Sequence, residues 1–559
     1  MQRLASICAL GILATFGARA VAVEQMVAAA NPIAAEAGMA VLRDGGSAAD
    51  AAVAIQAMLN LVEPQSSGIG GGAFILYWDA SARSLLTIDG RETAPASATP
   101  ERFLDDKGEK RGFWESAVGG QAVGVPGTVK SIDLLHRLYG KKAWASLLEP
   151  AIALAEKGFS VSPRLAKSIA SAKHLQRFDA TRDYFFDAQG QPLEQGTILR
   201  NPAFAETLRV LAGQGADAFY SGPIAAGIVA AVNASSWHTN NITLSDLSAY
   251  KAKIRVPVCQ TYRGYEVCGM GPPTSGGLTV GQILGMLEGF DLQKMGWGAE
   301  LVHHVAQAEK LAYADRAMYM GDSDFVPVPT AGLLNSQYLA ARAALIDADK
   351  AGPKALAGTP PGAQKLVLAP SVTPGLVGTS HFVIRDAEGN VLSMTTTIES
   401  GFGSRVMTGG FLLNNELTDF DRAPMRDGKP VANRVQAGKR PRSSMSPTIV
   451  MRNGAPHLAL GSPGGSRIIG YVAKTIIGVI DFGLSPQEAI NHGHFVHRNG
   501  KTLELETGTD AATFEAALKA KGHAVKVGTL TSGIHAILLG ENGLTGGADA
   551  RREGVVLSH

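Results

Sequence analysis

The 559-residue sequence predicts a layered α/β fold, and three observations support this prediction. Segments with strand-like and helix-like hydrophobic patterns alternate in both halves of the chain, as in proteins that pack helices onto sheets. Hydrophobic residues make up 45% and charged residues 18%, which provides apolar material for a large core and excludes a disordered protein. No repeat with a period of about 20–50 residues is present, which excludes a solenoid.

Helices dominate the first half of the chain. Residues 28–63 are alanine-rich and are predicted to form two helices separated by Asp44-Gly45-Gly46, with Ser47 as the N-cap of the second helix. Prolines interrupt the later helical pattern. The other elements expected in this half are strands over 74–78 and 85–89, a mostly helical region over 128–236 and a helix over 301–318.

A proline-rich segment divides the two halves. Residues 351–374 contain five prolines and no amphipathic period, which predicts an exposed, mobile linker. Beyond it, strands are expected over 381–385, 391–397, 456–461 and 534–540, and helices over 466–480 and 485–491.

The N-terminus has the pattern of a secretory signal peptide. Arg3 precedes a mostly apolar stretch over 4–17, which ends at Ala18-Arg19-Ala20, a small-residue cleavage pattern. We therefore predict a signal peptide over 1–20 and a protein exported to a bacterial periplasm; a buried N-terminal helix is the alternative. Removing 1–20 takes away two of 51 basic residues and leaves 49 against 49 acidic ones, so neither nucleic acid nor membrane is an expected partner.

Two cysteines remain after removal of the signal peptide. Cys259 and Cys268 lie on two short predicted strands around Tyr262-Arg263-Gly264-Tyr265, and a two-residue turn at 263–264 places them opposite each other. A disulfide is geometrically allowed there and suits an oxidising compartment. Two free core thiols are the alternative.

Two motifs suggest cofactors but lack the matching context. The loop 68–73 fits the dinucleotide pattern G-x-G-x-x-A, yet it enters a strand instead of opening a helix, so a loop against a buried site is preferred. The histidines of the H-x-H-x-x-H cluster lack a matching ligand pair, so strand-edge packing is preferred to metal ligation. No metal and no cofactor are therefore expected. The cluster consists of His492, His494 and His497.

Three short segments have residues suited to acyl chemistry. The loop 461–466 connects a strand to a helix, and its backbone N–H groups can stabilise an oxyanion; a plain tight turn is the alternative. Ser443 and Ser444 can bind a small anion, although serine-rich turns are usually caps. Thr379 follows Gly378 where the linker meets a strand. An ordinary strand-entry threonine is the default there, but a threonine at a chain start can use its own amine as base after self-cleavage.

Motifs throughout the chain resemble those of the γ-glutamyltransferase family, in the same order. The second half carries Thr-Ser-His at 379–381 and the similar segments 411–420, 441–447 and 461–467. The first half adds Asn-Pro at 31–32 and the segments 68–72, 89–95 and 124–128. The similarity covers nearly all of the chain beyond the signal peptide.

This resemblance implies an N-terminal-nucleophile hydrolase with a four-layer αββα sandwich. The precursor would cleave itself between Gly378 and Thr379, giving a large subunit, 21–378, and a small subunit, 379–559, which stay together as a heterodimer. The family resemblance also assigns the site. Thr379 would be the nucleophile, Thr397 its hydrogen-bonding partner, and Gly464 and Gly465 the oxyanion hole; Arg91, Ser443 and Ser444 would hold the substrate α-carboxylate, and Glu416 and Asp419 the α-ammonium.

Two departures from the family pattern affect selectivity. Glu399 stands where the family usually has asparagine, and adds negative charge beside the α-ammonium site. The segment 421–440 has no aromatic residue, whereas some members close the pocket with a tyrosine-bearing lid, so a more open pocket is expected.

The sequence thus leads to one preferred function and two alternatives. The preferred one is a γ-glutamyltransferase or glutathione hydrolase that transfers the glutamyl group of substrates such as glutathione to water, amino acids or peptides. The first alternative is a related acylase acting on glutaryl groups of cephalosporin-type substrates. The second, a catalytically silent binding protein, conflicts with the intact set Thr379, Thr397, Gly464 and Gly465.

Overall fold

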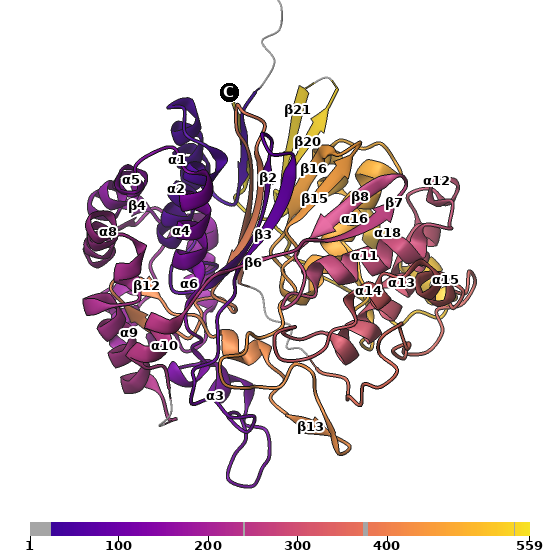
Figure 1. Ribbon diagram of the computed structural model, residues 1–559, viewed down its shortest axis with the longest axis horizontal. Coiled ribbons are helices and arrows are strands. Elements are labelled where there is room, and N and C mark those ends of the chain that lie inside the picture. The colour runs from indigo at the N-terminus through magenta and orange to yellow at the C-terminus, as the bar shows by residue number, and fades with distance from the viewer. Residues whose placement is uncertain (1–23, 239–240, 373–377, 542) are drawn as a thin grey trace, which may run out of the picture.

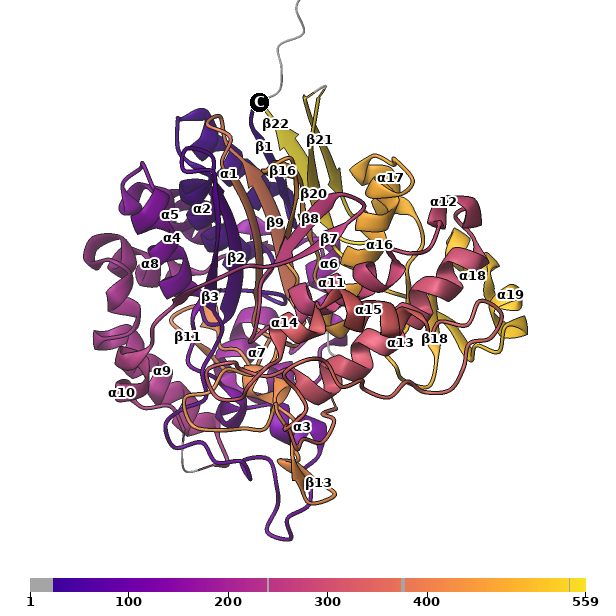
Figure 2. The same ribbon diagram turned by 45° about the vertical axis from the view of Figure 1, so that its right-hand side comes forward.

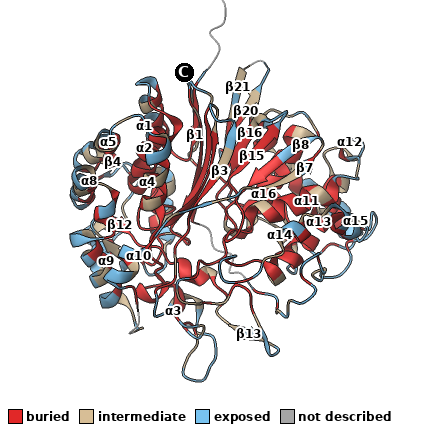
Figure 3. Ribbon diagram, viewed as in Figure 1, coloured by how far each residue is buried: buried red, intermediate tan, exposed pale blue. Residues whose placement is uncertain are grey.

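The computed structural model describes residues 24–238, 241–372, 378–541 and 543–559. Two antiparallel sheets face each other at the centre, and helices cover the outer face of each (Figure 1). Buried residues run through both sheets and the helix faces that pack on them (Figure 3). The predicted α/β class and the four-layer sandwich are therefore confirmed. The predicted signal peptide, 1–20, lies outside the described residues.

The first sheet combines strands from before and after the proline-rich segment. Its order is β22-β1-β9-β10-β2-β3-β6, and each neighbouring pair is antiparallel. Side chains alternate, so Val27 and Ala29 face the first helical layer while Met26 and Ala28 face the second sheet. The strands are β1 (Met26–Ala29), β2 (Gly72–Asp79), β3 (Ser84–Gly90), β6 (Lys253–Arg255), β9 (Thr379–Arg385), β10 (Val391–Thr397) and β22 (Val555–Ser558).

The second sheet is also antiparallel, in the order β21-β20-β16-β15-β8-β7. Its inner face packs on the first sheet, and its outer face carries the second helical layer. The strands are β7 (Val258–Tyr262), β8 (Tyr265–Gly269), β15 (Thr448–Arg452), β16 (Ala455–Gly461), β20 (His535–Gly540) and β21 (Gly543–Ala548).

The hairpin of β7 and β8 contains the predicted disulfide. Cys259 and Cys268 are directly opposite in the register, with Cα atoms 4.0 Å apart, and their sulfurs are bonded. The turn residues Arg263 and Gly264 both have positive φ, 51° and 79°, as a tight two-residue hairpin turn requires. The turn predicted at 263–264 and the disulfide are therefore both confirmed.

The first helical layer covers the outer face of the first sheet. Ser47 caps α2 through a capping box with Asp50, as expected. The expectation of helix over 28–31 is wrong, because Ala28 and Ala29 belong to β1 and Asn31 caps α1. The helices are α1 (Pro32–Arg43), α2 (Ala48–Val62), α4 (Thr128–Tyr139), α5 (Trp144–Lys157), α6 (Pro163–Ser171), α7 (Asp179–Phe185), α8 (Pro202–Gln214), α9 (Gly222–Ser235) and α10 (Leu244–Ala249).

One segment of this layer, Ala216–Ser235, is long and apolar enough to cross a membrane by length and composition alone. It consists of the short turn η3 (Ala216–Phe219) and α9. One face of α9, with Ala225, Ile228 and Val232, is fully buried in the core of the first layer. A core helix with one buried face passes the same length test.

The second helical layer covers the second sheet, and Figure 2 brings α11, α13 and α15 forward. The helix expected over 466–480 begins only at Ile468, after a tight turn, η5 (Gly465–Arg467). The helices are α11 (Gly276–Leu287), α12 (Leu292–Met295), α13 (Ala299–Tyr319), α14 (Thr330–Leu333), α15 (Ser336–Ala343), α16 (Ile468–Ile480), α17 (Pro486–Asn491), α18 (Asp510–Thr513) and α19 (Glu515–Ala520).

The proline-rich segment has no helix or strand over its described part, 351–372. The expectation that it is exposed holds only in part, because Ala351 and Ala369 are buried. The Ala355 N–H donates to Asn499 Oδ1 at 2.9 Å, and the Ser371 N–H donates to a carbonyl of α13 at 2.8 Å. The segment is therefore tied to the second helical layer over much of its length.

The remaining short elements lie in loops and at the edges of the layers. A hairpin of β13 and β14 lies within 421–440, the region that the sequence shows to lack aromatic residues. These elements are α3 (Phe113–Ala117), η1 (Gly120–Ala122), β4 (Phe159–Ser160), η2 (Leu175–Arg177), β5 (Ile198–Leu199), β11 (Met407–Thr408), β12 (Phe411–Leu412), η4 (Glu416–Asp419), β13 (Met425–Arg426), β14 (Lys429–Pro430), β17 (Phe495–Val496), β18 (Leu503–Glu506) and β19 (Val525–Gly528).

Candidate active site

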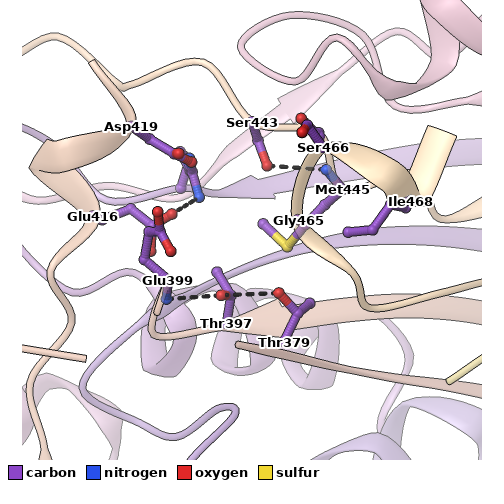
Figure 4. A pocket seen from close by; sticks show the side chains of 12 residues that line it. Thr379, Thr397, Glu399, Glu416, Asp419, Ser443, Met445, Gly465, Ser466 and Ile468 are labelled. Atoms are coloured by element: carbon purple, nitrogen blue, oxygen red, sulfur yellow. Dashed lines mark hydrogen bonds and ion pairs between the residues drawn. The ribbon is translucent and has the colours of Figure 1, made fainter. Parts of the chain in front are cut away.

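A small pocket lies where β9 begins and β10 ends, with a volume of about 30 Å³ (Figure 4). It brings together every predicted site residue except Gly378, which precedes Thr379, and Gly464, which precedes Gly465. None of residues 421–440 lines it. Its wall consists of Arg91, Thr379, Thr397, Glu399, Glu416, Asp419, Ser443, Ser444, Met445, Gly465, Ser466 and Ile468.

Thr379 and Thr397 both bind the carbonyl that joins Gly378 to Thr379. Thr379 Oγ1 donates to Gly378 O at 2.7 Å, and Thr397 Oγ1 donates to the same oxygen at 2.6 Å. The Glu399 N–H donates to Thr397 Oγ1 at 2.8 Å, which directs the hydroxyl proton of Thr397 toward that oxygen. The two hydroxyls are 3.3 Å apart. The hydroxyl predicted to be the nucleophile and a second hydroxyl donor therefore flank one peptide bond.

The hairpin turn after β9 sets this geometry. Thr379 and Thr397 are cross-strand partners in the β9–β10 register. Asp386 fixes the turn by accepting from the backbone N–H groups of Glu388 and Asn390, and Gly389 takes the positive φ of 88° that the turn requires. A hairpin of fixed loop length therefore brings Thr397 opposite the start of β9.

The glycine loop over 68–72 packs directly beneath this pair. A Cβ on Gly71 would lie 1.9 Å from Thr397 O, and one on Gly70 would lie 2.1 Å from Leu412 O. These distances leave no space for any side chain. The loop is therefore a close-packing element against a buried site, as the sequence indicated, and it precedes a strand, β2.

Arg91 lies at the centre of a buried acidic cluster. Its guanidinium donates to Glu416 and, at 2.6 Å, to Asp419, and its Nε donates to Pro441 O at 3.1 Å. The Arg91 side chain is 1% exposed. Its predicted contact with a substrate carboxylate stays a prediction, because its N–H groups here are directed at protein acceptors.

Several buried acids surround Arg91. Burial raises the pKa of Glu416 well above its usual value, and Arg91 opposes this rise only in part. Burial also raises the pKa of Glu399, and the neighbouring Asp419 raises it further. Burial brings the pKa of Glu92 to about 7. Burial therefore disfavours the ionised form of these carboxyls, and a ligand that carries an ammonium group would stabilise it.

Glu399 occupies an unusual backbone position. Its φ is 77°, in the left-handed region that non-glycine residues rarely adopt and in which asparagine is enriched. The geometry explains why asparagine suits this position and why glutamate there is a costlier choice.

The two serines line the pocket, and their hydroxyl oxygens accept hydrogen bonds from the protein. Ser443 Oγ accepts from the Met445 N–H at 3.1 Å, and Ser444 Oγ accepts from Arg316 Nη2 at 2.6 Å. With these lone pairs occupied, each O–H is directed to donate elsewhere. Two adjacent hydroxyl donors beside a guanidinium suit a carboxylate.

The loop that carries Gly464 and Gly465 turns sharply before α16. The two residues have φ values of 141° and 60°, which side chains rarely adopt, and a Cβ on Gly464 would lie 2.7 Å from the Tyr471 ring. Gly465 lines the pocket and begins the turn that leads into the helix. Backbone N–H groups at such a turn can stabilise a developing negative charge.

Sequence reasoning missed two arginines that support this site. Arg552 Nη1 donates to Thr379 O at 2.7 Å, and Arg552 Nε donates to Ser532 O at 2.8 Å. Arg552 therefore holds the backbone of Thr379, the first residue of β9. Arg316 orients Ser444. Both come from distant parts of the chain, and neither lies in a motif that the sequence reveals.

The histidine cluster forms no metal site in the described part of the chain. His494 Nε2 bonds Ser532 Oγ at 2.6 Å, and His492 Nδ1 bonds Asp510 Oδ2 at 2.6 Å, while the His497 N–H donates to Glu309. Among the described residues, the one group spaced for a metal contains the two disulfide-bonded cysteines and Glu266.

The chain is similar in sequence to one protein family and to several characterised proteins. A sequence profile of the gamma-glutamyltranspeptidase family matches residues 34–559. The chain is 38% identical over 545 residues to a glutathione hydrolase proenzyme of Bacillus subtilis, covering 95% of this chain and 91% of that protein. It is 36% identical over 548 residues to an acylase ACY 1 proenzyme of a Pseudomonas species, covering 95% and 92%.

A solved structure shares the whole fold. The chain superimposes on a cephalosporin acylase from Bacillus halodurans with a TM-score of 0.82 and 27% sequence identity, covering 99% of each chain. A protein named as an acylase therefore shares this architecture, and the sequence relatives include proteins named as glutathione hydrolases and as acylases.

Proposed function

The chain belongs to the gamma-glutamyltranspeptidase family, and from this premise we propose that it is a self-processing γ-glutamyltransferase and glutathione hydrolase. The enzyme cleaves the γ-glutamyl amide bond of small donors such as glutathione through an acyl-enzyme on Thr379. The acyl group then passes to water or to an amino acid or peptide. The relatives named as proenzymes support a precursor that matures by cleavage.

The first reaction is self-cleavage between Gly378 and Thr379. Thr379 Oγ1 attacks the Gly378 carbonyl carbon, the C–N bond breaks, and the amine of Thr379 takes up a proton, leaving an ester. Thr397 donates to the developing oxyanion from the position it already holds. Water then hydrolyses the ester, which frees the Gly378 carboxylate and regenerates the Thr379 hydroxyl. A Cβ on Gly378 would lie 2.6 Å from Glu399 O, so glycine is required for this approach.

The second reaction uses the freed N-terminus. The Thr379 amine acts as general base for its own hydroxyl, which attacks the γ-carbonyl of the donor. The backbone N–H groups of Gly464 and Gly465 stabilise the tetrahedral oxyanion. Collapse expels the amine of the leaving group, and water or an acceptor amine releases the glutamyl group. The enzyme that carries out this reaction is the heterodimer of 21–378 and 379–559 left by self-cleavage.

The observation that carries the glutamyl assignment is the charge pattern of the pocket. Arg91 and Asp419 form an ion pair at 2.6 Å that faces the pocket. A zwitterion can insert into this pair, giving its carboxylate to the guanidinium and its ammonium to the aspartate. Ser443 and Ser444 then donate to the carboxylate, and Glu399 and Glu416 add attraction for the ammonium.

The same pattern supports the glutamyl assignment over the acylase alternative, although acylases are among the relatives. A glutaryl chain has the carboxylate but lacks the α-ammonium. It would bring a further negative charge beside Glu399, Glu416 and Asp419 and no ammonium to offset it, which is unfavourable in a buried site. Initial rates with γ-glutamyl- and glutaryl-p-nitroanilide test this choice, and faster glutaryl turnover would overturn it.

A single substitution tests the nucleophile. Thr379→Ala removes the attacking oxygen, so we expect one uncut band on a denaturing gel and no γ-glutamyl hydrolysis. The wild-type protein should give two bands, the smaller beginning Thr379-Ser380-His381 by N-terminal sequencing. Thr379→Ser is the matched control, because it keeps a hydroxyl. Normal processing of the alanine variant would refute the assignment.

The proposal includes export of the precursor from the cytoplasm. A signal peptide over 1–20 would deliver the precursor to the periplasm, and the Cys259–Cys268 disulfide suits that oxidising compartment. No metal or cofactor is required by the chemistry proposed for Thr379.

A further inference from the structure

A second and much larger cavity adjoins the active-site pocket and shares Ser466 with it. Its volume is about 680 Å³, within the range of small-molecule sites. Its wall comes from α13, from residues 354–357 and 370–372, from Arg426 of β13 and from the chain on either side of the start of β18.

Basic side chains outnumber acidic ones on the wall of this cavity, and one of them, Arg426, is paired with Asp421 outside the wall at 2.9 Å. Five cationic side chains line it against one acid, Glu504. Glu504 is already paired with Arg467 at 2.7 Å and with Arg498 at 3.0 Å. The five cations are Arg316, Lys354, Arg426, Arg498 and Lys501.

Two of these cations are available to a ligand. Lys354 and Lys501 are exposed, and neither has an ion-pair or hydrogen-bond partner within the part of the chain that the structure describes. Lys354 is held in place by its neighbour, since Ala355 exchanges two backbone hydrogen bonds with the Asn499 side chain, each 2.9 Å long. The two lysines therefore stand on anchored segments on the cavity wall.

Two arginines connect this cavity to the active-site pocket. Arg498 Nη1 donates to Ser466 Oγ at 2.8 Å, directly after the Gly464–Gly465 turn. Arg316 lines the basic cavity and donates to Ser444 Oγ in the active-site pocket. A ligand that occupies both spaces would pass the Gly465 turn, where the acyl carbonyl of the proposed reaction lies.

We propose that the basic cavity is a subsite for the carboxylate of the peptide portion beyond the scissile amide. It would hold the acid end of a peptide leaving group and, in the transfer step, of a peptide acceptor. This inference rests on the proposed function, because it takes the glutamyl group to be bound in the active-site pocket. Cations favour a carboxylate over an uncharged amide of the same size, so the enzyme prefers donors whose leaving group ends in a free acid.

Two donors that differ in one group test the proposal. Glutamate release is measured from γ-glutamyl-glycylglycine and from γ-glutamyl-glycylglycinamide. For the wild-type enzyme we expect a KM about fivefold lower for the acid, with similar kcat. The variant Lys354→Ala/Lys501→Ala should raise the KM of the acid donor to that of the amide and leave the amide donor unchanged. Raising the salt concentration should shrink the wild-type preference.

The matched control removes two lysines elsewhere. Lys365→Ala/Lys526→Ala changes the net charge equally, and both lysines are exposed and lie outside the cavity wall. It should keep the acid preference. Equal KM values for the two donors in the wild type, or the same loss in the control variant, would overturn the proposal.

A separate measurement distinguishes failure of the proposed function from failure of the proposed subsite. If the wild type releases no glutamate from these donors and does not cleave γ-glutamyl-p-nitroanilide, the glutamyl assignment is wrong. The affinities of glycylglycine and glycylglycinamide for the protein, measured by calorimetry, then test whether the cavity binds a peptide carboxylate. Tighter binding of the acid that is lost in Lys354→Ala/Lys501→Ala supports the subsite, and equal binding of both peptides rejects it.

Discussion

Thr397 is already placed to assist the self-cleavage proposed at Thr379. In the uncut chain its hydroxyl donates to the carbonyl of the bond to be cleaved, and the Glu399 N–H orients it. The donor is thus in place before any charge develops, which is the arrangement that lowers a barrier most effectively.

Thr397→Val should slow self-cleavage by about 100-fold, since it removes one oxyanion donor without changing side-chain shape. A time course of the two-band pattern on denaturing gels after expression measures this rate. Thr397→Ser keeps the hydroxyl and should process at close to the wild-type rate. Equal rates for the valine and serine variants would contradict the role.

Glu399 should make donor selection depend on pH. Its pKa is raised by burial and by Asp419, and a bound α-ammonium lowers it, so affinity for a glutamyl donor increases as pH rises through the raised pKa. The kcat/KM ratio of γ-glutamyl- to glutaryl-p-nitroanilide should therefore rise with pH over the range in which the donor's own α-ammonium stays charged, below about pH 7.5. Taking the ratio cancels the titration of the shared nucleophile.

Glu399→Asn should flatten that ratio, because it removes one titrating acid and its repulsion of Asp419 and Glu416. Asparagine tolerates the φ of 77° at this position, so the fold should be unaffected. The groups that face Glu399 are Asp419, Glu416, Arg91 and Arg405. An unchanged ratio in the variant would show that Glu399 does not sense the ammonium.

At the scale of elements, the β7–β8 hairpin combines a tight turn with a disulfide across an edge of the second sheet. Closing a loop of this size restricts the unfolded chain and is worth about 2–3 kcal/mol. The hairpin contributes no residue to the active-site pocket.

Cys259→Ser/Cys268→Ser should therefore lower the midpoint of thermal unfolding. Its kcat/KM at about 25 °C should stay within about twofold of the wild-type value. Thermal unfolding of both proteins, with and without reductant, measures the midpoint. Reductant should lower the midpoint of the wild type and have no effect on the variant. A variant as stable as the oxidised wild type would contradict a stabilising role.

Elements with strong local signals could be predicted from the sequence. The capping box of α2, the β9–β10 hairpin and the β7–β8 turn depend on neighbouring residues alone. The errors occur at element ends. Residues 28–29 have helix-favouring alanines but lie in β1, since pairing with β9 and β22 outweighs their propensity. The start of α16 shifts to Ile468 because the Gly464–Gly465 turn adopts its own backbone conformation.

At the scale of the whole molecule, the two proposed subunits share both sheets. In the first sheet, β9 lies between β1, from before the cleavage point, and β10, while β10 also pairs with β2. In the second sheet, β8 pairs with β15. Cutting one peptide bond removes none of these hydrogen bonds.

We therefore expect the cleaved protein to remain a single species under native conditions. The two chains should elute together in gel filtration and separate only in denaturant. Mixing separately expressed 21–378 and 379–559 should recover little activity, because neither piece contains a complete sheet. Separation of the wild-type chains without denaturant would contradict this expectation.

The sequence by itself determined the alternation of helices and strands and the turn that makes the disulfide possible, and through family motifs it predicted the residues that the pocket brings together. These depend on local periodicity, turn chemistry and side-chain type. The tertiary structure alone decided what surrounds them. The ion pair of Arg91 with Asp419, the support of Thr379 by Arg552 and the basic cavity behind Ser466 each join residues far apart in the chain. Such contacts arise when two sheets built from both halves of the chain pack together, and no local pattern in the sequence encodes them.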